Sequence, residues 1–243
     1  MLPWITLATT RVPGGGVMTL VRRGDTFVIR IDGEELMANR MHHSEEMLAT
    51  LAFEPLEKDG LRPKARILIG GIGMGYTLRA ALDRLGPHGR VDVAELVPEV
   101  IEWNRGILAP LARRPLDDPR VRVVRGNVGH VIADARSEYD AIMLDVDNGP
   151  AALTAPSNAL LYGSDALART KRALVPNGML TIWAAGDERG FEARLAKAGF
   201  AARTVHVRAR TGRGGLRFIV FVGRSLPERA EAPVRGRRMP RAR

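Results

Sequence analysis

From residue 65 onward, the chain alternates between strand-sized apolar segments and segments with helical spacing. Strands are expected at residues 66–69, 90–94, 121–124, 139–145 and 179–184, and helices near 76–86, 97–112, 128–136, 158–174 and 188–198. Strands that alternate with helices in this way build a parallel sheet with helices on both faces. The alternation therefore predicts an α/β domain.

The end of this pattern departs from the alternation. Two β-rich runs, 204–208 and 216–222, are joined by a glycine-rich segment that leaves no room for a helix. They predict a terminal antiparallel hairpin. A parallel sheet that ends in such a hairpin is typical of Rossmann-like class I S-adenosylmethionine-dependent transferases. We therefore expect a seven-stranded sheet of that class over residues 61–223.

Residues 1–60 are expected to form a small N-terminal β-unit followed by one helix. Residues 18–34 read as two short alternating strands with turns at Gly24 and at Asp32-Gly33. Ser44 can cap a helix that starts at Glu45, and Pro55 is expected to end that helix before a connector over residues 55–64.

The composition leaves few options for thiol or metal chemistry. The chain has 243 residues, 45% of them hydrophobic, and no cysteine, so a disulfide framework and a thiolate metal site are excluded. His42 and His43 stand beside Glu45 and Glu46, but such neighbours are more often polar groups at a helix start, and we expect no metal. Apolar runs are far shorter than the roughly 20 residues of a membrane-spanning helix, which favours a cytoplasmic protein without membrane contact.

The positive charge is concentrated at the C-terminal end. Of the net charge of +10, residues 201–223 contribute five arginines and no acid, and residues 224–243 contribute seven arginines against two glutamates. The first 200 residues are therefore neutral overall. Residues 224–243 lack apolar periodicity, so we expect a basic, disordered tail. A solvated tail is favoured over one that binds nucleic acid.

A glycine-rich turn indicates a nucleoside site. The apolar strand at 66–69 runs into glycines at 71, 73 and 75 and then into a helix, so the backbone can approach a ligand closely. Glu95 ends the next strand, where a carboxylate can accept hydrogen bonds from both ribose hydroxyls. Asn127 closes the third strand and either reads an adenine edge or is a simple turn residue.

Two acids follow the fourth strand. Asp145 and Asp147 face the same crevice as the glycine turn, because ligands of open parallel sheets bind beyond the carboxyl ends of the strands. Asp145 is the stronger candidate for a catalytic carboxylate, and Asp147 is also explained as a helix or turn cap. The segment from 147 to 157 is interpreted either as a lid over the crevice or as a long connector.

Residues 31–222 resemble the polyamine aminopropyltransferases, the family of spermidine synthase. The resemblance is carried by Ile31-Asp-Gly-Glu-Glu-Leu followed by Glu45-Glu-Met-Leu, by the segment 116–127, and by Tyr139-Asp-Ala-Ile-Met-Leu-Asp. It implies a nucleoside donor held by Glu95. It also implies that Asp145 deprotonates and orients an amine, which displaces methylthioadenosine from decarboxylated S-adenosylmethionine.

The chain departs from this family at several site positions. Met74 stands where the family has an aspartate that grips the donor's amine, and the other departures are Glu35, Ser44, Glu45, Asn127 and Asn148. The leading interpretation is a transferase that uses S-adenosylmethionine or its decarboxylated form and a small-molecule amine. Met74 favours methyl transfer as the alternative. A non-catalytic protein that binds nucleic acid or a partner through its arginine-rich end is the other alternative, and the family implies a homodimer.

Overall fold

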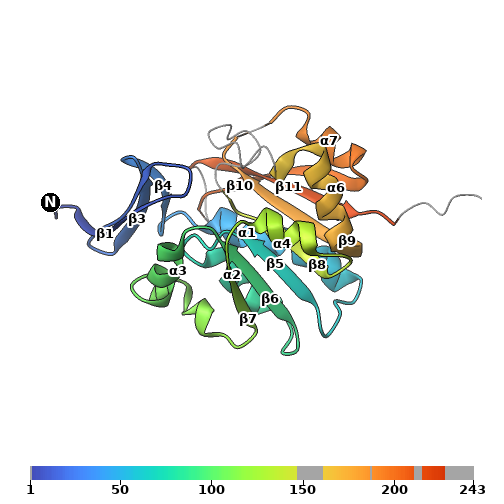
Figure 1. Ribbon diagram of the computed structural model, residues 1–243, viewed down its shortest axis with the longest axis horizontal. Coiled ribbons are helices and arrows are strands. Elements are labelled where there is room, and N and C mark those ends of the chain that lie inside the picture. The colour runs from blue at the N-terminus through green and yellow to red at the C-terminus, as the bar shows by residue number, and fades with distance from the viewer. Residues whose placement is uncertain (1, 147–160, 187, 211–214, 228–243) are drawn as a thin grey trace, which may run out of the picture.

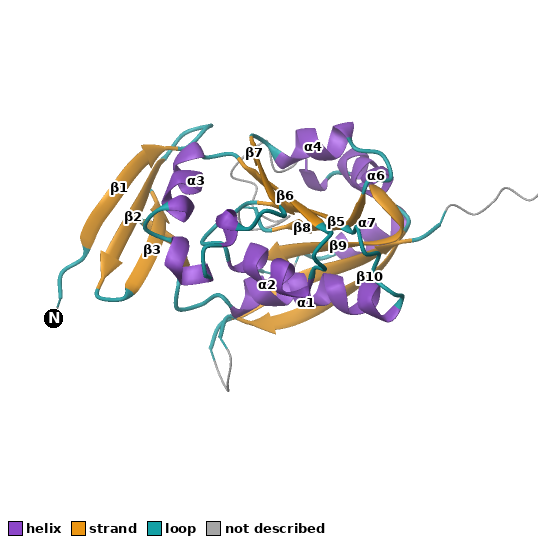
Figure 2. Ribbon diagram, turned by 90° about the horizontal axis from the view of Figure 1, so that it is seen from below, coloured by secondary structure: helices purple, strands orange, loops and turns teal. Residues whose placement is uncertain are grey.

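The computed structural model describes residues 2–146, 161–186, 188–210 and 215–227. It contains a four-stranded antiparallel sheet at the N-terminal end and a seven-stranded sheet that carries the helices. In Figures 1 and 2 the small sheet lies at one end of the molecule, next to α3 (Pro98–Arg105). None of the helices in the described part of the chain is long and apolar enough to span a membrane.

The N-terminal sheet has four strands where the sequence predicted two. They are β1 (Ile5–Arg11), β2 (Val17–Arg23), β3 (Thr26–Ile31) and β4 (Glu34–Ala38), paired in that order. The two predicted turns are present. Asp32 and Gly33 adopt φ of 49° and 89°, the left-handed conformations that a two-residue hairpin turn requires. β1 was missed because its side chains are half-buried or exposed, so no apolar face marks it.

The first helix differs from its prediction at both ends. α1 (His43–Lys58) starts before Glu45, and Ser44 does not cap it, because its hydroxyl donates instead to the Glu45 carboxylate at 2.6 Å. Pro55 lies inside the helix and does not end it. Phe53 and Leu56 are buried on either side of the proline, so packing of this turn offsets the backbone hydrogen bond that proline cannot make.

The large sheet has the predicted topology. Its strand order is β10-β11-β9-β8-β5-β6-β7. The bounds are β5 (Arg66–Gly70), β6 (Arg90–Glu95), β7 (Val121–Arg125), β8 (Tyr139–Leu144), β9 (Leu174–Ala184), β10 (Phe200–Arg208) and β11 (Arg217–Ser225). β11 runs antiparallel to both β9 and β10, which confirms the terminal hairpin. The chain leaves β5 for β6 on one side and later places β8 on the other, so a topological switch point lies between β5 and β8.

The helices of the large sheet are shorter than predicted over the described residues, and residues 158–160 of the helix predicted over 158–174 lie outside them. The helices are α2 (Tyr76–Arg84), α3, α4 (Val128–Asp134), α6 (Ser164–Ala173) and α7 (Phe191–Lys197). The helix expected over 97–112 ends at Arg105, because Gly106 follows it, and the chain continues as a 3₁₀ turn at Ala109–Ala112. β9 begins at Leu174, five residues before the predicted strand, and β11 extends to Ser225. The predicted disordered tail, residues 224–243, is wrong at its start, because Arg224 and Ser225 belong to β11, and residues 228–243 lie outside the described part of the chain.

Helices cover the large sheet on both faces, as Figure 2 shows. One face packs against α1 and α2 and shares a continuous apolar cluster with the inner face of the N-terminal sheet, which includes Leu20, Phe53 and Leu78. The other face packs against α4, α6 and α7 around Tyr139 and Phe191. The N-terminal sheet is therefore joined to the large sheet through a common core, and it reaches the carboxyl ends of the strands.

Candidate active site

The sequence-predicted site residues of three strands meet at one edge of the large sheet. The glycine turn follows β5, Glu95 ends β6, and Asp145 follows β8. Because these strands are parallel neighbours, their carboxyl ends lie side by side at the switch point. The structure thus brings together the predicted nucleoside site and the predicted catalytic carboxylate.

The glycine turn needs glycine for its own backbone before any ligand is considered. Gly71 has φ of 85°, and a Cβ added there would lie 2.3 Å from the carbonyl oxygen of Asp145. Gly73 has φ of 54°, and a Cβ there would lie 3.3 Å from the Sδ of Met37 on β4. Gly75, with φ of 87°, is the residue that precedes α2. The turn is therefore wedged between the end of β8 and the N-terminal sheet.

Glu95 is held rigidly by two backbone amides. Glu95 is 8% exposed, and its two carboxylate oxygens accept hydrogen bonds from the Ile72 N–H at 2.9 Å and from the Val97 N–H at 2.8 Å. Each carboxylate oxygen has a second lone pair. A carboxylate held in this way can also accept hydrogen bonds from ribose hydroxyls, and the ribose contact of Glu95 stays a prediction.

Asp145 is anchored by its backbone and by one side-chain partner. Its N–H donates to the Gly70 carbonyl at 2.9 Å, and its Oδ2 accepts from the Thr77 hydroxyl at 2.9 Å. Burial raises the pKa of Asp145 to about 6, and the hydrogen bond from Thr77 acts in the opposite direction. A carboxylate with such a pKa is mostly ionised at neutral pH and is a stronger base than an ordinary aspartate.

Glu45 joins this site from the first turn of α1. The Thr77 hydroxyl that donates to Asp145 also lies 3.3 Å from the Glu45 carbonyl oxygen, so α1, α2 and the end of β8 converge there. Burial and, to a smaller extent, the charge of Asp145 raise the pKa of Glu45 to about 8, while the hydrogen bond from Ser44 acts in the opposite direction. At neutral pH Glu45 is therefore mostly protonated, whereas Asp145 is mostly ionised.

Sequence reasoning assigned Glu45 to a helix start and passed over Thr77. The acid is favourable near a helix N-terminus, so nothing local distinguished it from an exposed first-turn glutamate. Tyr76 was also missed. Its ring stacks on His42 with the centroids 4.0 Å apart, and burial followed by the charges of Glu45 and Glu46 raises its pKa to about 12.

Four other predicted residues and the candidate lid have plain structural roles or lie outside the described chain. The Asn127 side chain accepts a hydrogen bond from the Gly129 N–H at 2.7 Å and caps α4, which is the turn role that the sequence left open. Met74 is 4% exposed within the main apolar cluster. Asp147, Asn148 and the candidate lid at 147–157 lie outside the described residues.

The histidines at the start of α1 contact a carboxylate. The Nδ1 atoms of His42 and His43 lie 3.0 and 3.5 Å from the two carboxylate oxygens of Glu46. Within the described ranges, histidine and acidic side chains do not gather in a group that could hold a metal ion.

Comparison with known proteins is consistent across sequence and structure. A family model described as the spermine/spermidine synthase domain matches residues 41–189. The chain is 32% identical over 122 residues to polyamine aminopropyltransferase 1 of Streptomyces coelicolor, covering 49% of this chain and 22% of that protein. It is 29% identical over 170 residues to the polyamine aminopropyltransferase of Mycobacterium tuberculosis, covering 69% of this chain and 30% of that protein. The chain therefore matches less than a third of the length of either relative.

Two solved structures share the fold. Spermidine synthase from Thermotoga maritima superimposes with a TM-score of 0.69 at 21% identity, covering 91% of this chain and 74% of that one. A spermidine synthase in complex with the transition state analogue AdoDATO gives a TM-score of 0.68 at 19% identity, covering 90% of this chain and 72% of that one. At these identities the likeness establishes the fold.

Proposed function

Because the chain belongs to the spermine/spermidine synthase family, we propose that it transfers an aminopropyl group from decarboxylated S-adenosylmethionine to a small-molecule amine. In this proposal the donor's nucleoside lies against the glycine turn, with its ribose on Glu95. The acceptor amine lies beside Asp145. Asp147 is the second proposed catalytic residue, and Asn127 and Met74 are proposed to contact the donor.

The observation that carries the proposal is the carboxyl pair of Asp145 and Glu45, which lies at the same sheet edge as Glu95. Burial raises the pKa values of both groups because it penalises the charged forms, and the charge of Asp145 adds to the shift of Glu45. A ligand with an ammonium group would stabilise both ionised forms and would favour loss of the proton from Glu45. A neutral or anionic acceptor would gain nothing from this arrangement.

In the proposed reaction Asp145 takes a proton from the acceptor's ammonium group. The freed nitrogen attacks the aminopropyl carbon that is bonded to the sulfonium sulfur, and a carbon–nitrogen bond forms as the carbon–sulfur bond breaks. The electron pair stays on sulfur, which leaves as methylthioadenosine. The raised pKa of Asp145 supports this role, because a general base works best when its pKa is close to the working pH.

Methyl transfer from S-adenosylmethionine is the second candidate, and Met74 is the observation that favours it. The related enzymes carry an acid at this position to grip the amine of the donor, whereas Met74 is apolar and buried. Without that acid, the donor site has less reason to require the decarboxylated form.

Product analysis separates the two candidates. The protein is incubated with each donor and with linear diamines and triamines, and the released nucleoside is identified by mass spectrometry. We expect methylthioadenosine, and Asp145→Asn should lower kcat by about a hundredfold or more while donor affinity changes little. Asp165→Asn, an exposed change on α6, is the matched control. S-adenosylhomocysteine as the only product would establish methyl transfer, and the absence of both products would overturn the proposal.

A homodimer in the cytoplasm completes the proposal. It is supported by the family, and light scattering of the purified chain tests the oligomeric state. A monomer at micromolar concentration would contradict it.

A further inference from the structure

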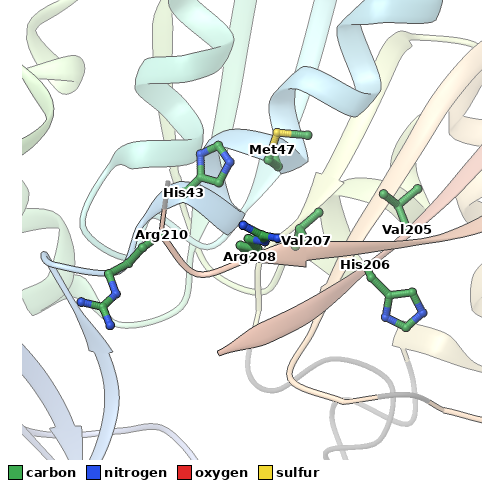
Figure 3. Close-up of a pocket in the computed structure, with 7 residues that line it drawn as sticks. All are labelled: His43, Met47, Val205, His206, Val207, Arg208 and Arg210. Carbon is green, nitrogen blue, oxygen red and sulfur yellow. The ribbon is translucent and has the colours of Figure 1, made fainter. Parts of the chain in front are cut away.

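A pocket of about 380 Å³ lies apart from the carboxyl pair, where the end of β10 passes the first turn of α1. It is lined by His43, Met47, Val205, His206, Val207, Arg208 and Arg210 (Figure 3). The His43 N–H donates to the Ala209 carbonyl at 3.2 Å, which ties the helix start to the chain just after β10.

The first turn of α1 separates this pocket from the candidate active site. His43 and Met47 are four residues apart and therefore lie on one face of the helix. Glu45 is two residues from each, roughly 200° around the helix axis, and its charge interacts with Asp145. The pocket and the carboxyl pair thus lie on opposite faces of the same helical turn.

The pocket combines basic groups with an apolar floor. Its polar lining consists of two imidazoles and two guanidinium groups, and no carboxylate of the described residues lines it. Met47, Val205 and Val207 supply the apolar part, and Val207 is 4% exposed. This chemistry suits a ligand that is both anionic and flat or apolar.

The basic character continues beyond the pocket along the terminal hairpin. β10 is the edge strand of the sheet, and Arg208 pairs in register with Arg217 on β11. Residues 201–223 contain five arginines and no acid, whereas the 200 residues before them are neutral overall. His206, Arg208, Arg210 and Arg217 are all exposed, and we call these four residues the hairpin basic surface.

We propose that the hairpin basic surface binds single-stranded nucleic acid, with phosphates on the arginines and one base in the adjoining pocket. Guanidinium groups pair with phosphate through two hydrogen bonds, and bases stack on imidazole and guanidinium planes. A site for a small anion would enclose it, whereas these arginines are exposed along a strand. Their exposure therefore favours an extended polyanion. The apolar floor of the pocket favours a nucleic acid over an acidic peptide, because a base can pack against apolar side chains and a peptide carboxylate cannot.

The test uses the full chain and a fluorescein-labelled 12-nucleotide oligodeoxythymidine, with fluorescence anisotropy measured over a range of salt concentrations. Binding should weaken as salt rises, because counterions are released from the strand. Arg208→Gln/Arg210→Gln removes two phosphate contacts, so the slope of log K against log salt should become shallower by about 1.4. Arg90→Gln/Arg172→Gln is the matched control, since both arginines are exposed at the amino-terminal ends of the strands, at the start of β6 and the end of α6, whereas Arg208 ends β10.

An unchanged slope in the first double variant would overturn the proposal and would place any binding elsewhere, as in the basic tail. If that variant melts early, Arg210→Gln/Arg217→Gln tests the same surface by the same slope. The proposed binding of a base in the pocket is tested with an abasic 12-mer of equal charge, whose affinity should be lower by about fivefold or more. Equal binding of the abasic strand, or tighter binding of a 12-residue polyglutamate, would refute nucleic acid as the ligand.

Discussion

Thr77→Val should shift the pH dependence of the proposed reaction in a direction that the structure determines. The variant keeps the size of the side chain but removes the hydroxyl that donates to Asp145 at 2.9 Å. That hydrogen bond favours the ionised carboxylate and lowers its pKa, so its loss should raise the pKa of Asp145 above the present value of about 6.

The magnitude follows from the competition for the Thr77 hydrogen. A hydrogen bond to a charged group contributes about 1.5–3 kcal/mol, and 1.36 kcal/mol corresponds to one pKa unit. When Asp145 is protonated, the hydroxyl can turn to the Glu45 carbonyl oxygen at 3.3 Å, which recovers part of the loss. We therefore take the lower end of the range, and the acid limb of the pH profile should move upward by about one pH unit.

The assay is kcat/KM for nucleoside release between pH 5 and 9, because this parameter reports the ionisation of the free enzyme. Near pH 6 the variant should lose about fivefold relative to the wild type, and above pH 8 the two should nearly coincide. Thr77→Ser, which keeps the hydroxyl, should retain the wild-type profile. An acid limb that stays in place or moves to lower pH would refute the reasoning, as would an equal loss at every pH.

Three further predictions concern the residues around this pair. Glu95→Gln should weaken methylthioadenosine binding by about ten- to a hundredfold, because an amide replaces a charged acceptor and one backbone N–H loses its partner. Calorimetric titration of both proteins checks this prediction. Unchanged affinity in a folded variant would exclude the ribose contact. Glu45 has a pKa raised from 4.5 to about 8, so its contribution to stability is present below pH 4.5 and is lost as pH rises through 8. Glu45→Gln should therefore match the wild-type Tm at acidic pH and exceed it at pH 9, and a Tm difference independent of pH would count against the raised pKa. Gly71→Ala should lower the free energy of unfolding by roughly 2–4 kcal/mol, since it combines a left-handed φ with a clash against the Asp145 carbonyl, and an unchanged urea midpoint would contradict that geometry.

The parts of the fold that the sequence predicted are those with strong local patterns. The strands of the large sheet are short, mostly apolar runs, and the segment between the last two is too short for a helix, so the alternation and the terminal hairpin could be predicted from spacing. The helix through Pro55 could not be predicted in the same way. Its continuation depends on Phe53 and Leu56 packing against the sheet, and that contact is absent from the local sequence.

The residues of the candidate site also differ in whether a local sequence pattern identifies them. Glu95 and the glycines were predicted because a strand, a turn and a helix define their places. Glu45 and Thr77 were not, because their role arises where α1, α2 and the end of β8 meet, and Asp145 lies 68 residues after Thr77. A first-turn glutamate has the same local pattern whether it faces solvent or another carboxylate. Only the fold distinguishes the two.

The close approach of Met37 to Gly73 means that substitutions in the N-terminal sheet and in the glycine turn constrain each other. A Cβ at Gly73 would lie 3.3 Å from the Sδ of Met37 at a left-handed φ, so a side chain there would be strained and would require Met37 to shift. Exchanging the N-terminal sheet for that of a relative would therefore succeed only if the incoming strand left the same space above the glycine turn. The N-terminal sheet and the glycine turn should therefore be exchanged together, although Met37 and Gly73 are 36 positions apart in the sequence.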